Sequence, residues 1–342
     1  MTIKIIQGNL NLHRELLIGT IFRLLTPHSD DRRFDWLYKN SPHGQARVWL
    51  AQADGEVIGV GAAFPRRYSV GHKIMTAWVL GDFCLDSRFR SLGPALALQR
   101  ACLSLMESEE AAFCYDFPSP SMAAIYQRLK ATPCQMLVRL ARPLRVDRKV
   151  REKIPVPVVR EMAKFLGNGL LRISRTARRH GSLVVSVHEG RCSPEFTVLA
   201  KELSGNIVPC IEHSAEYLNW RYLDNPTAEY HLMTARSDGR LCAYGVYTRV
   251  GEDGMLVDLL GVPDANIIRT LINDLSESLC EEGVYTLSTP MSEFHPWFAT
   301  LTKLGFQRRE SSPIIVLPSL AFLNDSQFDV NRIPFMQGDR DS

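Results

Sequence analysis

The chain has 342 residues, of which 45% are hydrophobic and 23% charged, and its formal net charge is +3 at pH 7. These values are ordinary for a globular protein of one or two domains, which can bury its cores without disulfide or metal staples. No apolar run approaches the roughly 20 residues of a membrane span, and the N-terminus lacks a signal-peptide pattern. We therefore expect a cytoplasmic protein.

The first half of the chain predicts alternating strands and helices. Residues 46–53 and 56–68 alternate around Asp54-Gly55, which indicates a hairpin. In segment 94–108, the apolar side chains of Ala95, Leu98, Cys102 and Leu105 share one helical face. In chain order, the sequence predicts strand 3–7, helices 11–26 and 31–39, strands 46–53, 56–68 and 75–86, helix 94–108, strand 111–116, helix 120–130 and strand 133–141.

The second half predicts the same order of elements. Its strongest signal is segment 265–282, in which Ile268, Leu271, Leu275 and Leu279 share a helical face. Around this helix, the sequence predicts strands 182–188, 230–236, 240–250, 255–261, 284–288 and 312–317 and helix 292–304. This order predicts an α/β (α+β) protein, in which each half is a mixed β-sheet with helices on both faces.

An internal repeat supports two lobes. Residues 34–42 read FDWLYKNSP and residues 218–226 read LNWRYLDNP, so that Trp36, Tyr38 and Pro42 recur 184 positions later. The same offset carries Asp54-Gly55 onto Asp238-Gly239. We therefore expect a tandem duplication, with a first lobe at 1–143, a linker at 144–180, a second lobe at 181–318 and a polar tail at 319–342.

The region between the lobes is basic. Residues 142–180 contain 12 lysines and arginines against 3 acidic residues. Segment 159–179 has the pattern of an amphipathic basic helix, interrupted by Gly167 and Gly169. Two interpretations stay open: a solvated helix lying across both lobes, or contact with an anionic surface such as a membrane or RNA. Nothing in the sequence predicts binding to DNA, and both a monomer and a homodimer are compatible with it.

The junction at 86–95 has the properties of a phosphate-binding turn. A strand ends near Asp86, a helix begins near Pro94, and Arg90-Ser91-Leu92-Gly93-Pro94-Ala95 joins them. A helix N-terminus offers free backbone N–H groups and a positive dipole to a pyrophosphate. Gly93 permits close approach of a ligand, and Arg90 adds charge.

The pattern R-x-x-G-x-A at 90–95 resembles the acyl-CoA signature of the GNAT (N-acetyltransferase) superfamily. The following FCYDFPSPSMAAIYQRLKA is similar to the family's next strand and helix, although Lys130 replaces a family glycine and Pro94 removes one N–H donor. The resemblance covers both copies and implies acetyl-CoA or another acyl-CoA as co-substrate. It implies a cofactor site formed by Cys84, Leu85, Arg90, Ser91, Leu92, Gly93 and Ala95, with an oxyanion donor on the backbone near Cys84 or Leu85, beside a bulge.

The resemblance also suggests catalytic groups. Tyr126 falls on the tyrosine that protonates the CoA thiolate in many members of the family. Asp82 and Asp116 stand at or near strand ends, where each can take a proton from the amine. In the second copy, Leu301 stands in the tyrosine slot, and Asp264 would place a carboxylate where phosphates should bind. We therefore expect the chemistry in the first lobe alone.

The resemblance thus implies an acyl-CoA-dependent N-acyltransferase acting on a small amine, with an amino sugar of cell-surface polysaccharide as one acceptor class. Two alternatives stay open: a FemAB-like ligase that uses aminoacyl-tRNA, and a non-catalytic sensor or scaffold. Neither the eight cysteines nor the nine histidines show metal-ligand spacing, so we expect no metal.

Overall fold

The computed structural model describes residues 3–70, 73–107, 111–147, 168–169, 183–204, 210–323 and 329–340. The basic helix expected at 159–179 lies outside these residues, apart from 168–169. No helix of the described residues is long and apolar enough to cross a membrane. All eight cysteines are free thiols, as expected, and most of them are buried.

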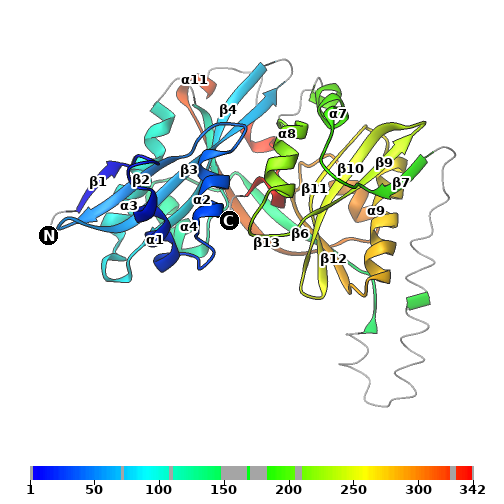
Figure 1. Cartoon of the computed structure of the whole chain (residues 1–342), viewed down its shortest axis with the longest axis horizontal. Coiled ribbons are helices and arrows are strands. Elements are labelled where there is room, and N and C mark those ends of the chain that lie inside the picture. The colour runs from blue at the N-terminus through cyan, green and yellow to red at the C-terminus, as the bar shows by residue number, and fades with distance from the viewer. Residues whose placement is uncertain are drawn as a thin grey trace, which may run out of the picture.

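The elements of the first lobe follow the predicted order (Figure 1). The predicted helix at 94–108 in fact begins two residues earlier, at Leu92, with Ser91 as its N-cap. The predicted helix at 31–39 is a short α-helix followed by a π-helix. In order, the elements are β1 (Ile3–Gln7), α1 (Arg14–Leu24), α2 (Asp31–Phe34), η1 (Asp35–Lys39), β2 (Arg47–Ala53), β3 (Glu56–Val70), β4 (Lys73–Leu85), η2 (Ser87–Phe89), α3 (Leu92–Leu103), η3 (Ser104–Glu107), β5 (Ala111–Asp116), α4 (Pro120–Arg128) and β6 (Gln135–Pro143).

The second lobe repeats this order. The predicted strand at 312–317 is longer than expected. The predicted helix at 292–304 is reduced to six residues, because the preceding strand ends at Ser292 and residues 293–297 form turns. Its elements are β7 (Leu183–Val187), α7 (Pro194–Ser204), β8 (Cys210–Ile211), α8 (Ala215–Leu218), η4 (Asn219–Leu223), β9 (His231–Ser237), β10 (Arg240–Val250), β11 (Asp253–Gly261), α9 (Ala265–Glu281), β12 (Thr286–Ser292), α10 (Phe298–Lys303) and β13 (Gln307–Pro318).

The two lobes exchange their last strands. The strand order is β1-β2-β3-β4-β5-β13-β6-β12-β11-β10-β9-β7, so one mixed sheet runs through both lobes. Strand β6 of the first half pairs with β12 of the second, whereas β13 of the second half pairs with β5 of the first. Strands β6 and β13 also pair with each other at the centre of the sheet. Each lobe is therefore completed by a strand from the other half of the chain.

Helices cover both faces of the sheet in each lobe, as expected. In the first lobe, Leu17 and Ile21 of α1 pack in one cluster with Val48 of β2. Leu98 and Cys102 of α3 pack in another cluster with Trp49 and Ala51 of β2, and Trp49 directly follows Val48. Because successive strand residues point to opposite faces, α1 and α3 lie on opposite sides of the sheet. Helices α7 and α9 divide the second lobe in the same way.

The repeated tryptophans meet at the contact between the lobes. Trp36 and Trp220 occupy equivalent positions in the two π-helices, η1 and η4. Their rings stack with centroids 5.4 Å apart. Trp36 Nε1–H donates to the carbonyl of Trp220 at 2.6 Å, and Trp220 Nε1–H donates to the carbonyl of Trp36 at 2.8 Å. The duplication therefore places the same residue on both sides of a pseudo-two-fold contact.

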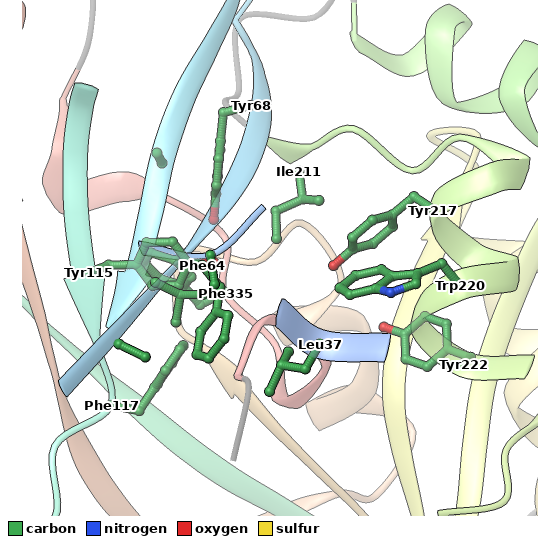
Figure 2. Packing of buried hydrophobic residues seen from close by; sticks show 14 of the residues in the cluster. Leu37, Phe64, Tyr68, Tyr115, Phe117, Ile211, Tyr217, Trp220, Tyr222 and Phe335 are labelled. Atoms are coloured by element: carbon green, nitrogen blue, oxygen red, sulfur yellow. The ribbon is translucent and has the colours of Figure 1, made fainter. Parts of the chain in front are cut away.

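Residues 329–340 of the C-terminal tail pack between the lobes. Ile333 and Phe335 are fully buried, and the ring of Phe335 lies against Tyr115 of β5. Figure 2 shows Phe335 beside first-lobe residues, with Tyr217, Trp220 and Tyr222 of the second lobe on the other side of Leu37. This part of the polar tail closes over the interface between the lobes.

Candidate functional site

A cavity of about 650 Å³ opens where two parallel strands of the first lobe diverge. Strands β4 and β5 pair only as far as Val79 and Tyr115, although both continue beyond this point. The cavity is lined by residues 79–83 of β4, by the end of β5 from Asp116, and by Gln99 and Cys102 of α3.

A bulge in β4 places Asp82 in this cavity. The register with β3 changes from Ala62–Gly81 to Val60–Cys84, so Asp82 and Phe83 oppose a single residue. Asp82 has a φ of 43°, a conformation unusual for a residue other than glycine. The bulge implied by the resemblance lies at Asp82 and Phe83.

Asp82 is held by two partners. Arg33 donates to both carboxylate oxygens at 2.7 and 2.8 Å, and the Tyr38 hydroxyl donates to one of them at 2.6 Å. Burial is the largest single effect and lowers the pKa of Arg33, but the charges and hydrogen bonds of Asp82 and Tyr38 together outweigh it and raise this pKa, so Arg33 remains a cation. This bidentate pairing favours a fixed structural carboxylate over a proton acceptor.

Asp116 and Tyr126, both candidates from the sequence, are hydrogen-bonded to each other. The Tyr126 hydroxyl donates to Asp116 at 2.8 Å and accepts from the Gln99 amide at 2.9 Å. Burial raises the pKa of Asp116 to about 6, against hydrogen bonds from Tyr126 and from the backbone of Phe117 that lower it. Asp116 lines the cavity, whereas Tyr126 is buried behind it. Asp116 is therefore accessible from the cavity, and its pKa lies closer to neutral pH than that of an ordinary aspartate.

The second lobe and the tail contribute two cations to this cavity. Arg221 follows Trp220 on η4, and Arg340 ends the described part of the tail. The Arg221 guanidinium donates to the carbonyls of Gly338 and Arg340, and that of Arg340 lies over the ring of Phe117. The site is therefore assembled from both lobes.

The predicted phosphate-binding turn lies at the start of α3. Arg90 folds back to donate to the carbonyl of Leu85 at 3.0 Å, and the N–H of Ser91 is bonded to Phe89. The N–H groups of Leu92 and Gly93, at the first two helical positions, have no acceptor within the helix. Pro94 is the third helical residue, where its missing N–H costs the helix nothing.

The space in front of the turn is open. A Cβ atom added at Gly93 would meet no atom within 4 Å, so the backbone is accessible to a ligand. The turn lies between β4 and α3, which both line the cavity, but none of residues 84–95 is among the lining residues. These features fit the diphosphate of a coenzyme A thioester, with Leu92 and Gly93 as its backbone donors. Ala95 follows in the same helical turn.

Cys84 and Leu85 lie beyond the bulge, where they pair with Val60 and Gly59 of β3. Both side chains are buried, and neither residue lines the cavity. Burial raises the pKa of the Cys84 thiol to about 12. Cys84 therefore has the properties of a core residue and not of a nucleophile.

The corresponding helix end in the second lobe is closed. Asp264 is the N-cap of α9, and its carboxylate accepts the N–H of Asn266 at 2.8 Å. This carboxylate therefore occupies the position that an incoming phosphate would need. Leu301, in the slot of Tyr126, is fully buried. The capped end of α9 is therefore less favourable for an anion than the uncapped end of α3.

Known proteins resemble this chain in structure but not detectably in sequence. No protein-family model matches the sequence, and no curated protein matches it. A GCN5-related N-acetyltransferase from Anabaena variabilis is 10% identical with a TM-score of 0.65, and the match covers 92% of this chain and 72% of that one. A tandem GNAT protein from the clavulanic acid biosynthesis pathway is 14% identical with a TM-score of 0.56, and the match covers 93% of this chain and 99% of that one.

This chain has the tandem GNAT fold. The N-myristoyltransferase of Saccharomyces cerevisiae, whose structure contains myristoyl-CoA, is also similar, at 11% identity and a TM-score of 0.56, over 92% of this chain and 82% of that one. At these identities the comparisons establish the fold. The two lobes predicted from the repeat and the GNAT fold implied by the resemblance are confirmed.

Sequence reasoning missed the basic groups of the site. Arg33, Arg221 and Arg340 come from three distant segments, and the strand exchange and the tail bring them together. No motif connects Arg33 with Asp82, 49 residues away. Tyr38, which the sequence identified only as part of the repeat, is buried and donates to Asp82. No metal-binding group of His, Cys, Asp or Glu occurs among the described residues.

Proposed function

We propose that this protein is an acyl-CoA-dependent N-acyltransferase with a single coenzyme site, located in its first lobe. One observation carries the proposal: the same fold occurs twice, but only the first copy has an open helix N-terminus at the end of its bulged strand. In that copy Gly93 faces open space, whereas Asp264 caps the equivalent helix of the second copy. A negatively charged diphosphate is therefore favoured at the first and repelled at the second.

The residues around the first cavity support acyl transfer to an amine. The backbone N–H groups of Leu92 and Gly93 would bind the diphosphate, and the coenzyme would supply the activated acyl group. Asp116 would accept the proton of the attacking amine, since its pKa of about 6 leaves it ionised at neutral pH. Tyr126, whose pKa burial raises well above its usual range, stays protonated and orients Asp116.

The role of Tyr126 as the acid that protonates the leaving thiolate stays a prediction. Its hydroxyl points to Asp116 in this structure, so a proton accepted by Asp116 could leave through Tyr126 by a relay. In such a relay Asp116 takes the amine proton and donates it to the Tyr126 oxygen, and the Tyr126 proton passes to the thiolate. This last transfer requires the Tyr126 hydroxyl, which is buried behind Asp116 in this structure, to turn toward the cavity. Asp82 stays the alternative base, but its carboxylate is occupied by Arg33.

Calorimetric titration with acetyl-CoA tests the coenzyme site. Gly93→Glu introduces a carboxylate at the turn and should abolish binding. Gly19→Glu is a matched control, because Gly19 is exposed on α1 and an added Cβ there also meets no atom within 4 Å. Unchanged affinity in Gly93→Glu would refute this location for the coenzyme.

The acceptor is tested by release of free thiol from acetyl-CoA in the presence of candidate amines. An amino sugar belongs in this set as the acceptor class expected from the resemblance.

A FemAB-like ligase would instead be stabilised thermally by aminoacyl-tRNA and not by acetyl-CoA. A sensor or scaffold would bind acetyl-CoA without releasing thiol with any amine. A ligand at 100 times its Kd stabilises the folded state by about 2.7 kcal/mol, which a thermal shift detects.

A further inference from the structure

The second lobe contains a separate cavity of about 400 Å³. Its walls are residues 258–261 of β11, residues 295–297 after β12, and Pro334 and Met336 of the tail. It occupies the position in the second lobe that the candidate acyl-transfer cavity occupies in the first, but the helix end beside it is capped by Asp264. A cavity of this size accommodates a small organic molecule.

One ion pair, between His213 and Asp258, lies in this cavity. His213 Nε2 lies 3.2 Å from Asp258 Oδ2, which also accepts the Tyr222 hydroxyl at 2.9 Å. Burial is the largest single effect and lowers the pKa of His213, but the charge and hydrogen bond of Asp258, together with the contribution of Cys210, outweigh it and raise this pKa well above its usual range. His213 is therefore a cation and Asp258 an anion, and their charges cancel. The second ring nitrogen of His213, Nδ1, is buried without a hydrogen-bond partner among the described residues.

Asp339 is a second carboxylate in this cavity, in addition to the Asp258 that pairs with His213. It is buried, lines the cavity, and accepts only the backbone N–H of Met336. Within the described residues, no cation lies close enough to form an ion pair with it. Burial raises the pKa of Asp339 to about 7, and the charge of Asp258 acts in the same direction, whereas the hydrogen bond from the Met336 backbone and the charges of His213 and Arg221 lower it. Burial lowers the pKa of His295 to about 4, so that imidazole is neutral and supplies no counter-charge.

We propose that this second-lobe cavity binds a small organic amine, with its ammonium group on Asp339 and its apolar body against Trp297 and the surrounding prolines. A buried carboxylate without a counter-ion is unfavourable, and a cationic ligand relieves that cost. Leu259, Pro263, Pro296, Trp297, Pro334 and Met336 supply the apolar lining. His213 Nδ1–H offers an additional donor to a hydroxyl or carbonyl on the ligand. The site needs no coenzyme and is independent of the proposed acyl transfer.

Three probes with the same apolar body test the ligand class: phenylethylamine, phenylethanol and phenylacetate, each titrated calorimetrically into the intact protein. Phenylethylamine should bind most tightly. Asp339→Asn should weaken its binding by at least about tenfold, because the counter-ion is lost. Asp329→Asn removes a charge from the same segment outside the cavity and should leave the affinity unchanged.

A second variant locates the site without altering the buried cluster. Ala265 is exposed at the mouth of the cavity, so Ala265→Trp should block entry while the fold is retained. Asp116→Asn, in the first-lobe cavity, should leave this binding in place. The proposal is overturned if phenylethylamine does not bind at millimolar concentrations, or if phenylacetate or phenylethanol binds as tightly. Unchanged phenylethylamine affinity in either Asp339→Asn or Ala265→Trp would also overturn it.

Discussion

Replacing Asp116 with Asn should make the protein more stable and less active. Asp116 has a pKa of about 6 in the folded state, and burial is the main cause. An unfolded aspartate titrates near about 3.9, so the difference is roughly two pKa units. At about 1.4 kcal/mol per unit, ionising this side chain in the folded protein costs up to about 3 kcal/mol. This is an upper bound, since Asp116 keeps part of its surface open to the cavity.

The sign of the pH dependence follows from the raised folded-state pKa. The protonated side chain stabilises the fold fully below pH ~4, and this contribution is lost as the pH rises through ~6. Asparagine does not titrate and can still accept the hydrogen bond from Tyr126. The stability advantage of Asp116→Asn over the wild type should therefore grow with pH and reach its full value above pH ~7.

Urea unfolding of both proteins at pH 5 and pH 8 measures this effect, because the difference between them cancels all other titrations. We expect the advantage of Asp116→Asn to increase by about 1 kcal/mol between these pH values. Turnover should fall by roughly 10²–10⁴-fold, the usual contribution of one acid–base group. A pH-independent difference, or a variant less stable than wild type at pH 8, would refute the assigned environment of Asp116.

Three other variants test the remaining features. Tyr126→Phe should reduce kcat by roughly 10²–10⁴-fold with unchanged acetyl-CoA affinity if Tyr126 is the acid; the acidic limb of its pH–rate profile should also move to higher pH, because a hydrogen bond that lowers the pKa of Asp116 is lost. A kcat within a factor of about three of wild type would reduce Tyr126 to a core residue. Trp36→Phe should lower the free energy of unfolding by about 1–3 kcal/mol, because the carbonyl of Trp220 loses its donor; a cycle with Trp220→Phe that gave no coupling energy would contradict the paired contact. A fragment ending at residue 147 should fail to fold cooperatively, because β5 then lacks its partner β13; a cooperative denaturation curve for it would show that β6 can take the place of β13.

The sequence predicted what depends on local pattern and on repetition. The alternating residues around Asp54-Gly55 and the apolar face of α9 define their elements without tertiary information. The offset of 184 residues also related the two π-helices, although it gave no indication that Trp36 and Trp220 touch. The turn at 90–95 was identifiable because a helix N-terminus is a local feature, whose anion affinity follows from a few consecutive residues.

The interface between the lobes could not be predicted in the same way. The pattern of buried and exposed residues in β6 does not reveal its partner. In a duplicated fold β5 and β12 are equivalent strands, and β6 could pair with either. The choice depends on chain connection: β13 inserts between β5 and β6 and thereby joins the lobes into one sheet. That exchange also brings Arg221 and the tail residue Arg340 to a cavity built mainly from first-lobe strands. The second copy thus contributes to the first-lobe site through the sheet and the tail, even though its own helix end is closed to phosphate.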